Sequence, residues 1–183
     1  QLQSSAASDV YKRQDRKSEG YGPSVKSFQK LIDKNVNLII TVDCGTMSFD
    51  AIDFANSKKI DVIVLDHHQS EINLPNAFSI INPNRIDDNS NLKYLCAAGV
   101  CFMTLISLNT LLRKSHWFTK KKIYEPDLIN FLDLVSLGTI CDVVPLIGLN
   151  RAIVKQGLKI INLKKNLGLK TLMDVCKIEN KTS

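Results

Sequence analysis

The sequence predicts an α/β domain with a mainly parallel sheet flanked by helices. Two short apolar runs rich in β-branched residues, Asn37–Asp43 and Asp61–Asp66, are separated by a helical pattern. The second run does not alternate apolar and polar residues, and both runs are predicted as strands buried in a parallel sheet. A strand, a helix and a strand within about thirty residues form a βαβ unit, which is parallel by default.

The remaining elements follow from the same periodicities and from capping residues. A third strand is predicted over Phe78–Asn82, and a basic connector over Arg113–Tyr124. The predicted helices cover residues 23–34 with Ser24 as cap, 48–58 with Ser48 as cap, 96–112, 126–137, 150–161 with Asn150 as cap, and 167–175.

Length and composition set the broad class. The 183 residues are 44% hydrophobic and 23% charged, enough for one domain with a real core. The net charge of +6 favours a polyanionic partner only weakly. Residues 1–14 are predicted as a non-native or disordered tail, 15–176 as a partial domain, and 177–183 as a truncated end.

The five cysteines contain no C-x-x-C motif and lie at irregular intervals in apolar stretches. They predict reduced core cysteines rather than disulfides or a zinc site. No apolar run is as long as a membrane span, and the amino end has no signal-peptide core. These features predict a cytoplasmic protein with no membrane partner.

Polar side chains able to bind metal lie at the ends of predicted strands or at turns. They are Asp43, Asp66, His67, His68 and Asp142. Ligands of open α/β sheets bind at the carboxyl ends of strands, and a buried carboxylate needs a partner. Carboxylates with imidazoles suit Mn²⁺ or Mg²⁺, and two such ions side by side favour phosphoryl displacement.

These residue types also have simpler interpretations. A single Asp at a strand end most often forms a turn or caps a helix, and several other aspartates are assigned to that class. Cys44 and Cys141 adjoin candidate carboxylates, but their side chains are expected to point into the core rather than to bind zinc. The chain has no nucleophile elbow, no phosphate-binding P-loop and no dinucleotide-binding glycine motif.

Three motifs resemble the DHH phosphoesterases: Val42–Thr46, Asp66-His67-His68 and Leu137–Leu146. Within that superfamily the chain is most similar to the RecJ exonucleases. Segments in matching order that support this closer similarity are Glu19–Gly22, Ile81–Arg85, Ala98–Phe102 and Asn150-Arg151.

The resemblance implies a site and a reaction. Asp43 would bridge two Mn²⁺ or Mg²⁺ ions, and His67 and Asp142 would complete one of them. His68 would contact the scissile phosphate or help to protonate the leaving oxygen, and Asp66 would orient an imidazole. The implied activity is 5′–3′ hydrolysis of single-stranded DNA to 5′-mononucleotides in recombination and repair. A monomer working with a single-strand-binding protein and a helicase is also implied.

The chain departs from the family in one motif. The Asp-x-Asp pair of the first DHH motif is absent, as are the later domains of RecJ. The sequence therefore resembles an internal fragment that is weak or inactive alone. Two alternatives stay open: a DHH phosphoesterase acting on short oligonucleotides or pyrophosphate, and a non-catalytic DHH scaffold module.

Overall fold

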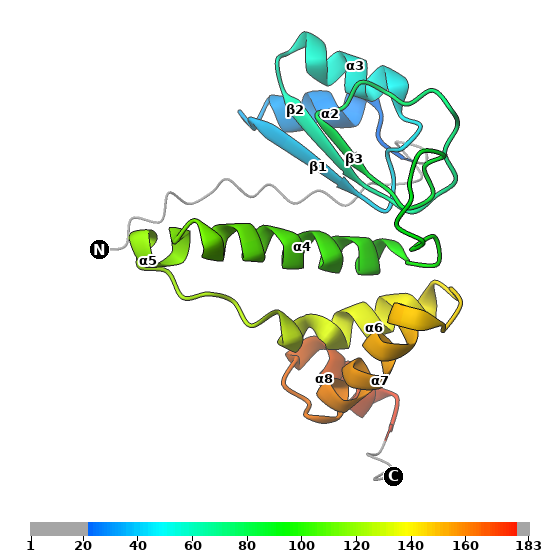
Figure 1. The fold of residues 1–183 in the computed structure, drawn as a ribbon, viewed down its shortest axis with the longest axis vertical. Coiled ribbons are helices and arrows are strands. Elements are labelled where there is room, and N and C mark those ends of the chain that lie inside the picture. Colours follow the sequence, from blue (N-terminus) through cyan, green and yellow to red (C-terminus); the bar gives the residue numbers. More distant parts are fainter. Residues whose placement is uncertain (1–21, 179–183) are drawn as a thin grey trace. The chain divides into compact units, whose positions relative to one another are not determined.

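The computed structural model describes residues 22–178 (Figure 1). The predicted tail over residues 1–14, most of the segment Glu19–Gly22 and residues 179–183 lie outside this range. The described chain forms two compact units that divide between Lys93 and Tyr94. All the described helices and strands of both units lie within the stretch 15–176 predicted as one partial domain, and that domain assignment stays a prediction.

The first unit contains a parallel three-stranded sheet. Its strands are β1 (Leu38–Val42), β2 (Asp61–Leu65) and β3 (Ser79–Ile81), in the spatial order β1-β2-β3. The register pairs Val42 with Leu65 and Leu65 with Ile81, so the three strands end on one line. The predicted parallel α/β architecture is confirmed.

Two helices, α2 (Val25–Ile32) and α3 (Phe49–Ser57), pack on one face of this sheet (Figure 1). Ser24 caps α2 as predicted, because its hydroxyl accepts the amide of Ser27. Ser48 precedes α3 but makes no side-chain cap. The buried core consists of Phe28, Ile39, Ala51, Ile52, Ala55, Val62 and Val64.

Strand β1 corrects one expectation. Its residues alternate between buried and exposed, and the side chains of Leu38, Ile40 and Val42 are about half exposed. The prediction of a buried strand therefore holds for only one face of β1. The described helices of this unit cover only the face that carries Ile39, so the opposite face of β1 keeps its contact with solvent.

The second unit is helical. Its elements are α4 (Ala97–Lys114), α5 (Trp117–Lys121), a 3₁₀ helix η1 (Leu128–Phe131), α6 (Leu132–Cys141), α7 (Gly148–Asn162) and α8 (Leu167–Val175). Phe102, Leu132, Val135 and Ile153 form its core. Within residues 22–178, no helix is both long enough and apolar enough to cross a membrane.

The structure changes the role of Asn150. Helix α7 begins at Gly148 instead of after Asn150, so Asn150 lies in its first turn and is not the cap. Its buried side-chain amide donates to the carbonyl oxygens of Tyr94 at 2.7 Å and Pro145 at 3.0 Å. Asn150 therefore ties the segment before α7 to the start of the unit, a tertiary role that local sequence does not reveal.

The cysteines also differ in part from the prediction. All five are free thiols, as expected. Only Cys96 is buried, however, while Cys141 and Cys176 are exposed. The expectation that Cys141 points into the core is wrong, because this residue occupies the last turn of α6 on a solvent-exposed side.

Candidate metal centre

The candidate site lies where the three strands of the first unit end. Asp43, Asp66 and Asn82 are the first residues after β1, β2 and β3. The amide of Asp43 donates to Leu65 at 2.9 Å and that of Asp66 to Ile81 at 3.1 Å, so the backbone ladder continues one residue past the strands. The sheet register therefore sets these three side chains next to one another.

Asp43 leaves the strand in an uncommon backbone conformation. Its φ angle is +61°, in the left-handed region that asparagine and aspartate tolerate better than most residues. Such conformations cost about 1–3 kcal/mol and concentrate at functional sites. The turn that follows directs the Asp43 carboxylate toward the loop after β2.

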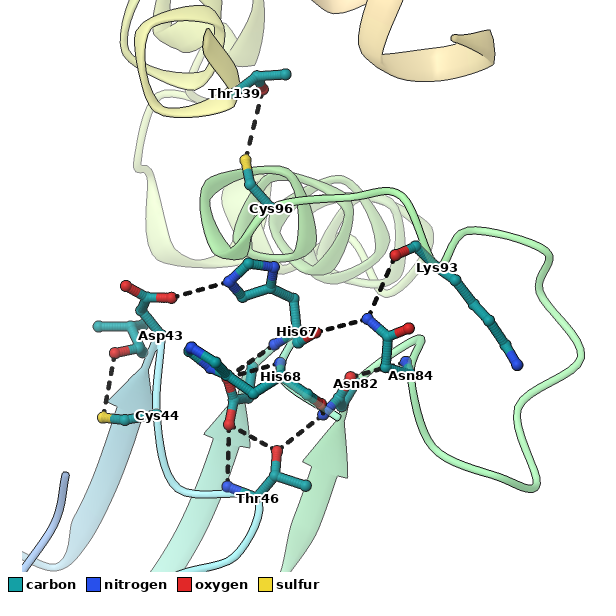
Figure 2. A network of polar contacts seen from close by, with 12 residues as sticks. Asp43, Cys44, Thr46, His67, His68, Asn82, Asn84, Lys93, Cys96 and Thr139 are labelled. Atoms are coloured by element: carbon teal, nitrogen blue, oxygen red, sulfur yellow. Dashed lines mark hydrogen bonds and ion pairs between the residues drawn. The ribbon is translucent and has the colours of Figure 1, made fainter. Parts of the chain in front are cut away.

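Asp43, His67 and His68 come together at this edge (Figure 2). One ligand atom from each lies within 4.8 Å of the other two. Nε2 of His67 is 3.2 Å from Oδ1 of Asp43, and the two imidazole centroids are 4.7 Å apart. The Asp43 side chain is 64% exposed and that of His67 15%, so the cluster is open to solvent on its carboxylate side.

The donor set fits a divalent ion. Adjacent ligands of an octahedral ion, each about 2.1 Å from the metal, lie about 3 Å apart. The distance of 3.2 Å between the His67 nitrogen and the Asp43 oxygen suits such a pair. A site made of carboxylate and imidazole ligands favours Mn²⁺ over ions that prefer thiolate ligands.

Asp66 organises the loop from beneath. This carboxylate is 1% exposed. Its Oδ2 accepts the amide of Thr46 at 3.0 Å and the Thr46 hydroxyl at 2.7 Å. Its Oδ1 accepts the amides of His67 at 2.8 Å and His68 at 3.3 Å. Burial alone raises the pKa of Asp66, but hydrogen bonds from Thr46, His68 and the backbone outweigh burial and lower that pKa to about 2.

The same carboxylate sets the tautomer of His68. Nδ1 of His68 lies 2.7 Å from Oδ1 of Asp66. An ionised carboxylate only accepts hydrogen bonds, so Nδ1 carries the proton and donates it. In a neutral His68 the lone pair then lies on Nε2, the nitrogen available for proton transfer or for a ligand.

Replacing Asp66 with asparagine should lower the free energy of unfolding at pH 7 by about 2 kcal/mol, from a pKa of about 2 against the ordinary 3.8. A lowered pKa stabilises the fold above pH 3.8, and this contribution is lost as the pH falls through the folded value of about 2. The difference between wild type and variant should therefore shrink in acid. Urea titrations of the chain near pH 7 and pH 2 measure it.

Asp53→Asn, on the exposed side of α3, is the matched control and should leave the urea midpoint unchanged at both pH values. A difference between wild type and Asp66→Asn that stays constant from neutral pH to acid would contradict the proposed role of the Asp66 charge.

Cys44 adjoins the cluster but does not resemble a metal ligand. Burial, followed by the charges of Asp66 and Asp43, raises the pKa of its thiol to about 11. The protonated Sγ donates to the carbonyl oxygen of Val42 at 3.3 Å. Because metals bind the thiolate, this environment supports the expectation that Cys44 does not ligate an ion.

Asp142 lies in the second unit. It is exposed and forms the C-terminal cap of α6, so it follows a helix rather than a strand. Helix α6 runs to Cys141, four residues past its predicted end, and the backbone amide of Asp142 still donates to the carbonyl oxygen of Gly138 at 3.0 Å. The predicted ligands are thus divided between the two units, with Asp43 and His67 in the first.

Three residues that hold this loop were not predicted from the sequence. Thr46, Asn82 and Asn84 lie in segments that resemble the DHH and RecJ motifs, but the sequence pattern gives their side chains no role. Their side chains bond to Asp66 and to the carbonyl oxygens of His68 and His67 (Figure 2). For Asn82 a signal existed, because it ends a predicted strand just as Asp43 and Asp66 do.

The fold and the donor set define an α/β domain with a candidate divalent-metal site at the carboxyl edge of a parallel sheet. Residues 3–139 match the family described as "DHH family, N-terminal domain". The chain belongs to the DHH family.

Relatives of known sequence support the finer resemblance. The chain is 41% identical over 162 residues to the single-stranded-DNA-specific exonuclease RecJ of Escherichia coli K12, covering 88% of this chain and 28% of that protein. It is 35% identical over 159 residues to RecJ of Bacillus subtilis 168, covering 87% of this chain and 18% of that protein. The chain thus spans under a third of the length of these relatives.

Solved structures agree. The crystal structure of exonuclease RecJ bound to manganese aligns with 91% of this chain, and the alignment covers 39% of the RecJ chain, with a TM-score of 0.71 and 30% identity. RecJ from Thermus thermophilus in complex with Mn²⁺ matches 83% of this chain and 21% of its own, with a TM-score of 0.64 and 28% identity. The predicted resemblance to the RecJ exonucleases is confirmed.

Proposed function

We propose that this chain is part of the catalytic domain of a metal-dependent 5′–3′ exonuclease. The longer protein that would contain it, here called the parent exonuclease, hydrolyses single-stranded DNA to 5′-mononucleotides in recombination and repair. The observation that carries the proposal is the cluster of Asp43, His67 and His68 at the ends of β1 and β2. The names of the relatives supply the substrate.

In this proposal Asp43 and His67 hold Mn²⁺ or Mg²⁺, and Asp142 is a further ligand of the same centre. Such ions supply a hydroxide at neutral pH and neutralise charge on the phosphate. His68, held by Asp66 through Nδ1, presents Nε2 toward the scissile phosphate or the leaving oxygen. The exposed side of the Asp43 carboxylate leaves room for the nucleic acid.

The proposal extends to the surroundings of the parent exonuclease. The parent exonuclease acts in the cytoplasm as a monomer, with a single-strand-binding protein and a helicase as partners that deliver single strands. Two ions complete its centre, and the Asp-x-Asp pair that this chain lacks supplies ligands for them. The chain alone therefore binds metal weakly and turns over little or no DNA.

Nuclease assays on single strands blocked at one end test the proposal. With Mn²⁺, the parent exonuclease should release mononucleotides from a long strand with a free 5′ end and should spare a strand blocked at that end. Chelation of the metal should abolish release. The 183-residue chain, assayed in parallel, should show little activity.

The results distinguish the alternatives. Cleavage restricted to very short oligonucleotides or pyrophosphate would favour another DHH phosphoesterase. No cleavage of any phosphoester by the parent exonuclease would favour a scaffold module. Strong Mn²⁺-dependent activity of the 183-residue chain alone would refute the claim that its site is incomplete.

A further inference from the structure

We propose that Asn82 is a positioning residue for the imidazole of His68, acting through Thr46, Asp66 and the loop backbone. Asn82 follows β3 and is only 3% exposed. The inference deepens the proposed function, on which its kinetic consequence rests.

Each polar group of the Asn82 side chain has a partner in the first unit. The amide nitrogen donates to the Thr46 hydroxyl at 2.8 Å and to the carbonyl oxygen of His68 at 2.9 Å. The amide oxygen accepts the backbone amide of Asn84 at 2.8 Å. Removing this buried amide lowers stability, because each of its hydrogen-bond partners is then left unsatisfied.

The bond to Thr46 has a directional consequence. The Thr46 hydroxyl oxygen accepts a hydrogen bond from the Asn82 amide. Its single proton is therefore free to be donated to Oδ2 of Asp66, 2.7 Å away. The other oxygen of Asp66, Oδ1, accepts a hydrogen bond from Nδ1 of His68. Asn82 thus reaches the His68 ring by this relay, and it holds the His68 backbone directly (Figure 2).

Asn84 adds a second tie to the same loop. Its side-chain amide donates to the carbonyl oxygen of His67 at 2.5 Å and to that of Lys93 at 3.3 Å. Asn82 and Asn84, which follow β3, therefore hold the backbone carbonyl groups of both histidines by hydrogen bonds. Because Asn82 also accepts the Asn84 amide, it orders the residue that makes this second tie.

A simpler interpretation is that Asn82 only forms a turn. Asparagine commonly accepts the backbone amide two residues later, and the bond to Asn84 is of this kind. That role uses the amide oxygen alone and gives no reason for the two donated bonds to Thr46 and His68. The variant Asn82→Ser separates the two interpretations, because a serine hydroxyl can form the turn but cannot make both donations.

The first readout is the tautomer of His68, observed by nitrogen NMR of histidine-labelled, metal-free chain. Wild type should show a proton fixed on Nδ1. Asn82→Ser should shift the His68 ring signals toward a mixture of tautomers while the protein stays folded. Asn56→Ala is the matched control, because Asn56 makes a similar bond to the Asn76 carbonyl at 2.8 Å, away from the strand ends. It should leave the His68 signals unchanged.

The second readout is kinetic and uses the parent exonuclease. Mutation of a residue that orients a metal ligand through a hydrogen bond typically lowers metal affinity or activity about 10- to 100-fold. Asn82→Ser should lower kcat by about this factor with little change in KM for single-stranded DNA. The NMR readout does not depend on the reaction, so failure of the exonuclease proposal would leave the positioning role separately testable.

If Asn82→Ser fails to fold, the pair Thr46→Ser and Thr46→Val tests the relay. Serine keeps the hydroxyl between Asn82 and Asp66, and valine removes it at nearly the same volume. His68 should keep its tautomer in Thr46→Ser and lose it in Thr46→Val. Unchanged His68 signals in folded Asn82→Ser, or in folded Thr46→Val when only that variant folds, would overturn the proposal.

Discussion

Replacing Asp43 with alanine should abolish Mn²⁺ binding to this chain and lower turnover of the parent exonuclease about 1000-fold. The reason is geometric, because Asp43 contributes the carboxylate of the cluster and stands 3.2 Å from Nε2 of His67. Metal stabilisation of a transition-state charge contributes several kcal/mol, and about 4 kcal/mol corresponds to three orders of magnitude in rate.

Calorimetry with Mn²⁺ measures the binding, and mononucleotide release measures turnover. His67→Ala should behave like Asp43→Ala, because it removes the imidazole paired with that carboxylate. Asp61→Ala is the matched control, since Asp61 is an exposed aspartate at the opposite end of β2. It should leave binding and turnover unchanged.

The outcomes are sharply separated. Wild-type Mn²⁺ affinity in both Asp43→Ala and His67→Ala would mean that the ion binds elsewhere, and the proposed centre would be wrong. If wild-type chain binds no Mn²⁺, the missing Asp-x-Asp pair is indispensable to the site. The effect of Asp43→Ala on the parent exonuclease then decides the role of this carboxylate alone.

Replacing Gly157 with alanine should destabilise the second unit by about 2 kcal/mol, the usual cost of overpacking a core. Gly157 lies in the interior of α7, where alanine is ordinarily better than glycine by about 1 kcal/mol. Here an added Cβ would overlap the carbonyl oxygen of Leu132 and the side chain of Ser136. Since one of these atoms is backbone, α6 and α7 would have to move apart.

Urea unfolding followed by circular dichroism measures this change. Gly168→Ala in the first turn of α8 is the control, because its Cβ would meet only Asn166 Oδ1 at 3.4 Å. That variant should be neutral or slightly stabilising. A rise in the urea midpoint for Gly157→Ala would show that the two helices separate without cost and would contradict the tight contact.

The strand ends and their chemistry were predictable from local sequence. Apolar runs that stop on Asp43 and on Asp66-His67-His68 located two strands within a residue or two of their observed ends. The parallel arrangement then placed these side chains at one edge. The strand-to-strand distance is short, so proximity of Asp43 and His67 followed from the pattern alone.

Burial and helix boundaries were less predictable. The run that forms β1 is apolar throughout, yet its burial depends on which helices cover it, and local sequence does not contain that information. Asn150 has the residue type of a helix cap, but two carbonyl oxygens, one of them more than fifty residues away in sequence at Tyr94, determine where its amide points. Long-range partners override local propensity in both cases.

The sequence by itself determined which strands form, that they run parallel, and that carboxylates and imidazoles follow two of them. Only the tertiary structure decided which polar atoms pair. The register that aligns Val42, Leu65 and Ile81 places Asn82 beside Thr46, and Thr46 beside Asp66. Register depends on contacts between segments distant in sequence, whereas hydrophobic periodicity is local, and this is why the sheet was predictable and the hydrogen-bond network was not.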